Sequence, residues 1–392
     1  MIRSLDAPTR RLYILFLAGF IAFGAIFTIA GAGLPQIIRT FGWSYAVTGA
    51  VLSASALGYL VSTFLSGILL ARVPARAVLV TALGIGALSW SLFGRWASPW
   101  LNFCLYFGSG ICMGGIEVVA NLEIIHMERN GQSRLMNLLH AAFCVGAVVG
   151  PASMGFLTRT GLSILSVFSV TAGFLAVMAI LFSVIRFPRV RPEPGHEEAQ
   201  GLRLLRQPVL LLLTLVLLLY VGVEIGVSSW SSEYFVKVLG ASPSTGAFAV
   251  ALFWTGLLAG RLGISVGYRG TRQELVMLVL AVLSSAGLVL LLLARSVPAV
   301  AGAVVLAGLG CSGFYPLAIS VVGRYYKSGV AIGTAVTGGA AGSVAFPFLM
   351  ALLSQSVGMR GGFWFYLALS LVLVGLTGAL ARQVRPGRQD RG

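Results

Sequence analysis

The feature that most constrains this chain is a succession of apolar stretches, each long enough to form a helix across a lipid bilayer. A hydrocarbon core of ~30 Å takes about 20 helical residues to cross. We count twelve such stretches, and only 10% of the residues are charged, against roughly 25% in an ordinary soluble domain. The sequence therefore predicts an integral membrane protein with spans at 12–34, 46–70, 76–94, 99–125, 135–157, 163–186, 207–230, 244–265, 273–294, 298–322, 330–353 and 361–382.

The net charge of +16 is distributed unevenly between the two sides of these spans. Six basic residues fall on one side, and the other 21 of the 27 fall on the opposite side, together with both ends of the chain. This is the positive-inside asymmetry, so we expect a multi-pass protein of the plasma membrane, the inner membrane of a bacterium, with both termini cytoplasmic. The basic charge then serves topology and lipid contact, and no nucleic-acid partner is expected. The four cysteines show no metal-ligand spacing, so no metal is expected either.

An internal repeat divides the chain. A polar stretch at 186–208 separates two sets of six spans, which predicts an N-terminal bundle at 1–190, a cytoplasmic linker at 191–206 and a C-terminal bundle at 207–392. Equivalent residues recur at an offset of 198 or 196: Gly42, Ser44 and Gly58 with Gly240, Ser242 and Gly256, and Gly146 and Pro151 with Gly342 and Pro347. We expect an all-α fold of two parallel six-helix repeats. Such repeats resemble the major facilitator architecture, in which the substrate site lies near the bilayer midplane between the halves.

Two carboxylates inside the predicted spans are the sharpest functional signals. An ionisable group at the centre of a membrane helix costs ~3 kcal/mol on insertion scales, so it faces the bundle interior and usually serves function. Nine of the eleven acidic residues are assigned to loops or termini: Asp6, Glu123, Glu128, Glu193, Glu197, Glu198, Glu233, Glu274 and Asp390. Glu117 and Glu224 remain.

Glu117 shares a helix face with Asn121, which suits the lining of a cavity. A carboxyl group there can exchange a proton as its exposure alternates between the two sides, and it can contact substrate. The alternative is a protonated glutamate that hydrogen-bonds another helix. Glu224 lies toward the outer half of its span, where water is closer. Proton coupling and a structural role are therefore equally favoured for it.

Further polar and aromatic residues are candidates for substrate binding. Asn137 and His140 share a face of the fifth span, and a histidine can relay protons to Glu117 or bond solute hydroxyls. Aromatic rings can stack on the apolar face of a sugar, which nominates Tyr220, Trp254, Phe314 and Tyr315. For each of these residues, packing between helices is the alternative.

Three arginines at helix ends are candidates for conformational gating. Arg72 and Arg76 lie in "GILLARVPAR" after the second span, and Arg261 lies in "GLLAGRLG" of the eighth. These segments resemble the cytoplasmic loop signature of the major facilitators, whose arginines bridge helix ends. A simple positive-inside role is the alternative.

One family within the major facilitators is similar in several spans. The segments "GGIEVVANLEII" and "SRLMNLLHAAFCVGAVVGP" resemble spans four and five of the fucose:proton symporters, and "LYVGVEIGVSSWSSEYF" and "ALFWTGLLAGR" resemble spans seven and eight. The resemblance implies that Glu117 takes the role of the family's proton-linked, substrate-facing glutamate, with Asn121 in the same motif. Two departures stand out: the first span has no acidic residue, and Phe143 falls at or near a substrate-contacting asparagine of the family.

Together these features predict a secondary active transporter and not an enzyme, since no nucleophile and base occur together. The expected function is proton-coupled symport of a small, neutral, hydroxylated, sugar-like solute by alternating access. The alternatives are proton-driven efflux of amphipathic compounds and a receptor or sensor without flux. No cofactor is expected; protons are the expected coupling ion, with sodium as the alternative. The expected partners are the solute and membrane lipids, and the expected state is a monomer.

Overall fold

The computed structural model describes residues 6–70, 72–127, 134–185, 187, 207–268, 272–326 and 329–383. Throughout those ranges the regular structure is helical, without strands. The chain forms two compact units: the first comprises Met1–Pro194 with Ser242–Ala251, and the second comprises Gly195–Ala241 with Leu252–Gly392. The predicted linker at 191–206 lies outside the described residues.

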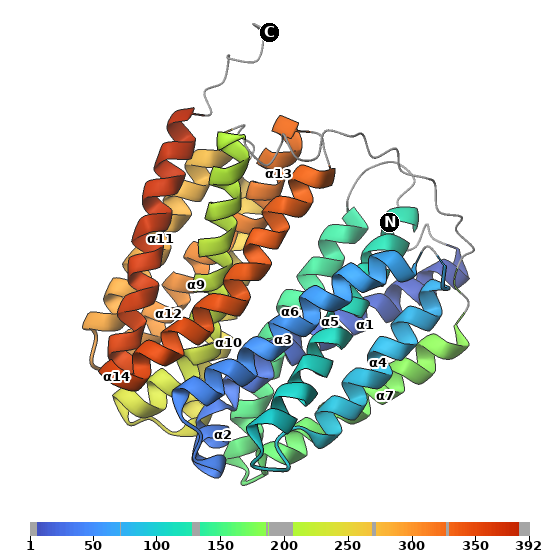
Figure 1. The fold of residues 1–392 in the computed structure, drawn as a ribbon, viewed down its shortest axis with the longest axis horizontal. Helices are drawn as coiled ribbons and strands as arrows, with labels where there is room; N and C mark the ends of the chain where they lie inside the picture. Colours follow the sequence, from blue (N-terminus) through green and yellow to red (C-terminus); the bar gives the residue numbers. More distant parts are fainter. Residues whose placement is uncertain are drawn as a thin grey trace, which may run out of the picture. The chain divides into compact units, whose positions relative to one another are not determined.

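The helices of the first unit follow the first six predicted spans (Figure 1). They are α1 (Ala7–Ala32), α3 (Tyr45–Leu69), α4 (Ala75–Leu92), α5 (Pro99–Met127), α6 (Arg134–Arg159) and α7 (Ile164–Val184), with a short additional helix α2 (Leu34–Phe41) after α1. Gly42 ends α2 with φ 63°, and the Ser44 side chain then caps α3 by accepting from Val47 N. Serine caps and left-handed glycines thus set these boundaries, as they do in other helices.

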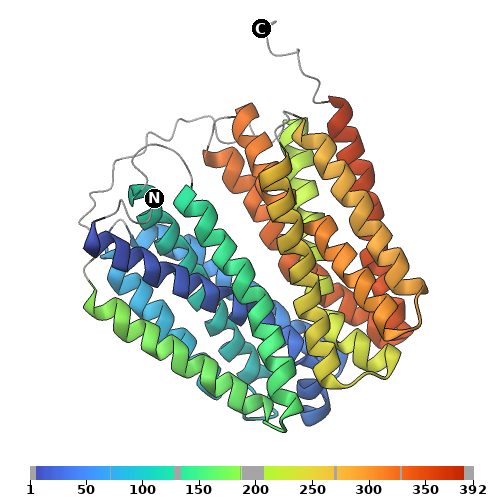
Figure 2. The same ribbon diagram turned by 180° about the vertical axis from the view of Figure 1, so that it is seen from behind.

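The second unit contains α9 (Pro208–Leu239), α10 (Pro243–Gly267), α11 (Gln273–Leu293), α12 (Val297–Cys311), α13 (Phe314–Tyr326) and α14 (Gly329–Gln383). The long α14 covers two predicted spans, and Gly358, with φ 76° and ψ 168°, interrupts it between them. Figure 1 shows the two arms that meet at this interruption, and Figure 2 shows the same helices from behind. Within the described residues, eleven helices are long and apolar enough to cross a membrane. This count takes the two arms of α14 as one helix.

The predicted span at 298–322 differs from the structure, because it consists of two helices rather than one. The sequence "CSGFYP" explains the break between α12 and α13. Pro316 has no N–H to bond the carbonyl of Ser312 four residues earlier, and it crowds that carbonyl. Ser312 O therefore lacks the backbone donor that a continuous helix would supply, and it can accept a hydrogen bond from a side chain.

Glycines bring the same pairs of helices together in both units. A Cβ on Gly58 would overlap Phe107 O of α5, and a Cβ on Gly256 would overlap Val305 O of α12. The reciprocal contacts also recur, from Gly110 to Ser55 O and from Gly308 to Phe253 O. All four pairs are separated by 198 residues, so backbone contacts that only glycine permits confirm the internal repeat.

The first turns of α10 belong to the first unit, where α6 holds them. Arg159 Nε donates a hydrogen bond to Ser244 Oγ (2.9 Å), and Ser244 Oγ donates to Gly155 O (2.7 Å). The Arg159 guanidinium also lies over the ring of Phe248, 5.0 Å from its centroid. A cation and two hydrogen bonds therefore fix the start of α10 to the end of α6.

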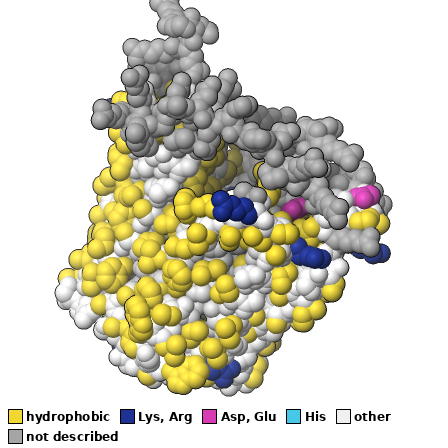
Figure 3. All heavy atoms as spheres, turned by 45° about the vertical axis from the view of Figure 1, so that its right-hand side comes forward, with side chains coloured by type: hydrophobic (Ala, Val, Ile, Leu, Met, Phe, Trp, Pro, Cys, Tyr) yellow, Lys and Arg dark blue, Asp and Glu magenta, His cyan; other side chains and the backbone are white. Residues whose placement is uncertain are grey.

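Much of the outer surface is apolar, as expected for helices that face lipid. Val184, Trp100 and Phe64 are at least 70% exposed. Figure 3 shows hydrophobic side chains over most of the visible described surface, with a few separate groups of basic side chains. In water such a surface would be an aggregation hazard, whereas in a bilayer it matches the solvent.

Candidate functional site

The carboxyl group of Glu117 is hydrogen-bonded within the first unit. Glu117 lies on α5, and Tyr59 Oη from α3 donates a short hydrogen bond to its Oε2. The glycines that precede it explain how α3 comes so close, because Gly110 and Gly114 pack directly on Ser55 and Ser62 of α3. Both Glu117 and Tyr59 remain half-buried, so the pair is partly open to its surroundings.

A group of aromatic rings from α1 and α6 begins next to this pair. The ring of Phe23 stacks on Tyr59 at 6.5 Å between centroids and meets Phe143 of α6 edge-on at 4.8 Å. Phe27 contacts Phe143 at 5.6 Å, and Phe20 contacts the imidazole of His140 at 5.6 Å. The carboxylate and tyrosine hydroxyl thus lie beside a wall of phenyl rings, with His140 at its edge. We call Tyr59, Glu117, Phe23, Phe27 and Phe143 the first-unit site.

The two asparagines predicted to bind substrate lie on different helices, α5 and α6. Asn121 is half-buried one turn after Glu117, and its Oδ1 is buried with no hydrogen-bond partner among the described residues. A buried amide oxygen without a partner is costly, so it is a site where a bound donor would gain affinity. Asn137 lies in α6, but its side chain is outside the described residues.

The second predicted carboxylate, Glu224 of α9, has a different environment in the second unit. It is buried, and its neighbours are Arg261 of α10, which supplies a positive charge, and Tyr220, whose hydroxyl lies close without a hydrogen bond of regular geometry. Arg261 Nε also donates to Ser312 O at 2.9 Å, the carbonyl freed by Pro316. Arg261 therefore joins Glu224 to the break between α12 and α13.

The aromatic candidates of the second unit mostly lie in its core. Tyr220 and Phe314 are fully buried and stacked, with centroids 5.0 Å apart at 16°. Trp254 is also buried, and its Nε1 donates to Ser228 Oγ at 2.7 Å. Tyr315 is 36% exposed at the start of α13. In this structure Tyr220, Phe314 and Trp254 pack the protein, and only Tyr315 presents an open ring.

Two of the three arginines predicted to gate the transporter lie at helix ends in the first unit, whereas Arg261 belongs to the second unit. Arg72 is exposed after α3, and Arg76 is exposed in the first turn of α4. Arg76 Nη1 donates to Ser183 O, near the end of α7, at 3.3 Å. A positive charge there also complements the partial negative charge of the helix terminus.

Three acidic residues assigned to loops or termini are instead helical and buried. Glu123 of α5 and Glu233 of α9 are within membrane helices, and Glu274 is in the first turn of α11. Glu123 was misplaced because it lies only two residues before the predicted end of its span, yet α5 continues to Met127. Its Oε2 has no partner among the described residues.

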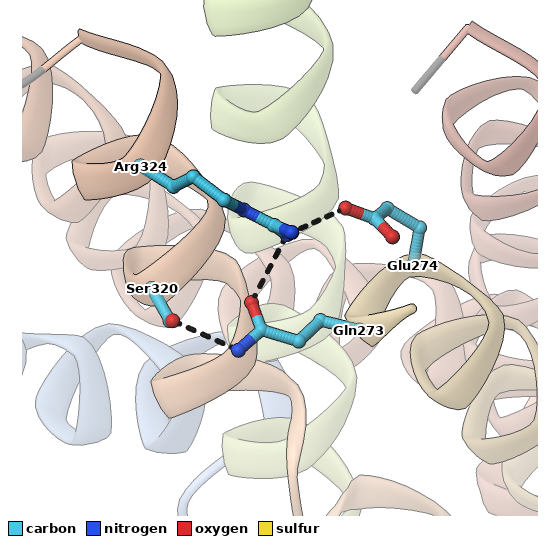
Figure 4. Close-up of polar contacts among 4 residues, drawn as sticks. All are labelled: Gln273, Glu274, Ser320 and Arg324. Atoms are coloured by element: carbon cyan, nitrogen blue, oxygen red, sulfur yellow. Dashed lines mark hydrogen bonds and ion pairs between the residues drawn. The ribbon is translucent and has the colours of Figure 1, made fainter. Parts of the chain in front are cut away.

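Glu274 belongs to a polar cluster that joins α11 to α13 (Figure 4). Arg324 Nη2 lies 2.8 Å from Glu274 Oε1 in a salt bridge and also donates to Gln273 Oε1 at 3.3 Å. Gln273 Nε2 donates in turn to Ser320 Oγ at 2.9 Å. These contacts pair the charge of Glu274 within one unit, so we assign them to stability rather than to a binding site.

Tyr59, Phe23 and Phe27 were missed by reasoning from the sequence. No charge or motif distinguishes them from other aromatic residues in membrane helices. One signal was present: Gly58, a repeat-related glycine, marks the side of α3 that packs on α5, and Tyr59 is next to it. The position of Tyr59 next to Gly58 was therefore the one sequence signal for a contact between Tyr59 and α5.

Comparison with known proteins places the chain in a family. The model of the Major Facilitator Superfamily matches residues 15–273. An uncharacterized MFS-type transporter of Yersinia pestis is 24% identical over 338 residues, with 84% of this chain and 87% of that protein covered. An uncharacterized transporter of Sinorhizobium fredii is 26% identical over 386 residues, covering 94% and 96% of the two chains.

Solved structures of transporters share the fold. The nucleoside transporter NupG superposes with a TM-score of 0.80 at 13% identity, over 95% of this chain and 99% of that one. The E. coli fucose:proton symporter FucP superposes with a TM-score of 0.63 at 17% identity, over 95% and 99%. At these identities the likeness shows the fold alone.

Proposed function

This chain belongs to the Major Facilitator Superfamily, and from that premise we propose that it is a proton-coupled symporter for a small, neutral, hydroxylated solute. Its membership makes it a multi-pass membrane transporter and not an enzyme. The proton, the class of solute and the direction are parts of the proposal. The single observation that carries it is the half-buried Tyr59–Glu117 hydrogen bond beside the phenyl rings.

The coupling rests on the two forms of one carboxyl group. Ionised Glu117 accepts the hydrogen bond of Tyr59, and protonated Glu117 gains a donor of its own that can bond a solute hydroxyl. A charge in a membrane interior is expensive, so protonation lowers the cost of moving the loaded site away from water. Proton and solute therefore favour each other at Glu117, which is the condition for symport.

The surroundings of Glu117 define the kind of solute. Phe23, Phe27 and Phe143 offer apolar surface, and Asn121 Oδ1 and the Tyr59–Glu117 pair offer hydrogen bonds. A solute with hydroxyls and one flat apolar face fits both. The names of the two structural neighbours refer to nucleoside and fucose, which both have that character.

Efflux of amphipathic compounds in exchange for protons is the second candidate. It is favoured by Phe143, which supplies a phenyl ring at or near the position where the resemblance to the fucose:proton symporters implies an asparagine. A ring wall with few polar atoms binds amphipathic molecules as readily as sugars.

The test is uptake into proteoliposomes under an imposed pH gradient, with monosaccharides, nucleosides and amphipathic compounds as solutes. We expect the native chain to accumulate a hydroxylated solute, and Glu117→Gln to abolish accumulation while equilibrium exchange of labelled solute persists. Glu123→Gln is the matched control, because Glu123 is a buried carboxyl group on the same helix outside the first-unit site. It should retain accumulation.

Three results would contradict the proposal. Accumulation by Glu117→Gln at the native level would remove Glu117 from coupling. Accumulation driven by a sodium gradient, and not by a pH gradient, would show that sodium rather than the proton is the coupling ion. Movement of amphipathic compounds alone, against the proton gradient, would favour the second candidate.

A further inference from the structure

An open groove outside the first-unit site runs between α1 and α7. It has a volume of about 520 Å³ and is lined by Ile14, Leu15 and Ala18 of α1 and by Met178, Leu181 and Val184 of α7. Residues 11 and 18 of α1 are separated by about 10 Å along the helix at 1.5 Å per residue, which gives the approximate length of the groove. Both helices belong to the first unit, so its geometry depends on that unit alone.

The walls and floor of the groove are apolar and well supported. Ile14, Leu181 and Val184 are exposed by 52%, 41% and 73%, whereas Met178 is only 4% exposed and forms the floor. On the same two helices, Phe16 and Phe182 are buried and pack together with ring centroids 5.2 Å apart. Buried side chains of both helices therefore lie behind the groove, and the exposed side chains of its walls are apolar.

One end of the groove is positively charged. Arg11 is part of its lining and is exposed. Arg10 precedes it, and Arg76 lies at the same end, since its guanidinium bonds Ser183 O beside Val184. Asp6, at the start of α1, is the nearest described acid along that helix. Three positive charges thus outweigh one negative charge where the apolar groove ends.

We propose that this groove is a binding site for an anionic phospholipid such as phosphatidylglycerol, with one acyl chain along α1 and α7 and the phosphate at Arg11. A guanidinium can bond two oxygens of a phosphate in parallel, which makes Arg11 the specific contact. Basic pockets between membrane helices on the cytoplasmic side bind anionic headgroups in this way. The apolar lining accepts any acyl chain, so the selection among lipids comes from charge.

The charge argument also decides against zwitterionic lipids. A choline headgroup carries its own positive charge, which Arg10, Arg11 and Arg76 would repel. The contribution of one arginine near an anionic headgroup corresponds to about a fivefold change in affinity. We therefore expect a clear but moderate preference for the anionic lipid.

The experiment measures lipid retained by the purified full-length chain in nanodiscs of phosphatidylglycerol and phosphatidylcholine, counted by native mass spectrometry after release. The native chain should retain phosphatidylglycerol selectively, and Arg11→Gln should weaken that retention about fivefold. Arg39→Gln is the matched control, because Arg39 is an exposed arginine in the last turn of α2, away from the groove. It should retain the lipid as the native chain does.

A second pair of variants tests the acyl-chain part of the site. Ala18→Trp should fill the groove and reduce retention, whereas Val170→Trp, at an exposed position of α7 outside the lining, should not. Equal loss with Arg11→Gln and Arg39→Gln would overturn the proposal. So would equal retention of both lipids by the native chain. Transport by Arg11→Gln reports separately on the proposed function, because the groove shares no residue with the first-unit site.

Discussion

Glu117 and Glu224 differ in how their charge is balanced, and this difference separates their roles. Glu224 has Arg261 beside it, whereas the described partner of Glu117 is the neutral hydroxyl of Tyr59. A buried charge without a counter-ion is relieved most simply by binding a proton. Glu117 is therefore the better candidate for reversible protonation, and Glu224 for a fixed charge that holds Arg261 at the break between α12 and α13.

Removal of the Tyr59 hydroxyl should impair coupling and leave the fold intact. A hydrogen bond to a charged group contributes about 1.5–3 kcal/mol. We expect Tyr59→Phe to lower gradient-driven accumulation by about tenfold or more, while the ring keeps its stack on Phe23. The measurement is initial uptake rate against solute concentration at several imposed pH gradients.

Tyr13→Phe serves as the control for that experiment. It removes a hydroxyl of the same unit that donates to Leu135 O at 2.9 Å rather than to a carboxylate. If both variants lose accumulation equally, the Tyr59 hydroxyl has no special link to Glu117, and the effect is one of packing.

At the scale of helices, a proline and a few glycines explain most departures from straight, independent spans. Pro316 separates α12 from α13 and frees the carbonyl that Arg261 binds. Gly110 and Gly308 place α5 against α3 and α12 against α10 at repeat-related positions. Helices in lipid have no hydrophobic force between them, so this close packing is a main source of their association.

Alanine at either of these glycines should destabilise the protein. The added methyl group would meet backbone oxygens, Ser55 O for Gly110 and Phe253 O for Gly308, which cannot rotate away. We expect Gly110→Ala and Gly308→Ala each to cost about 1–3 kcal/mol, the usual cost of overpacking. A lower unfolding temperature in detergent would show this.

Gly84→Ala is the control, since nothing lies within 4 Å of a Cβ at that position of α4. It should unfold at the native temperature or slightly above, because alanine favours helix. Equal unfolding temperatures for Gly84→Ala and Gly110→Ala would refute the close-packing argument.

At the scale of the whole molecule, the distribution of basic residues predicts the orientation in the membrane. Asp6 and Arg39 precede and follow the first span, and both are exposed. With Cys104, the exposed cysteine, replaced by serine, Arg39→Cys should react with a membrane-impermeant maleimide in intact cells. Asp6→Cys should react only after permeabilisation. The reverse pattern would place the termini outside.

Reasoning from the sequence could identify the apolar spans, the repeat, and Glu117 and Glu224 within membrane helices, because each depends on local composition or on spacing along the chain. Length and apolarity define a span wherever it packs. Sequence reasoning assigned Glu123, Glu233 and Glu274 to loops or termini, whereas all three are helical and buried. Burial near a helix end depends on which neighbouring helix covers that end. Sequence reasoning also could not place Tyr220 and Trp254 in the core rather than in a cavity.

What the sequence determined by itself was the helical membrane fold and the presence of Glu117 inside it. Only the tertiary structure decided what Glu117 contacts. Tyr59 is 58 residues away along the chain, and Phe23 and Phe143 lie on two further helices. Helical periodicity tells which residues share a face, but the partner of that face follows from packing between helices, which glycine contacts and side-chain shape select.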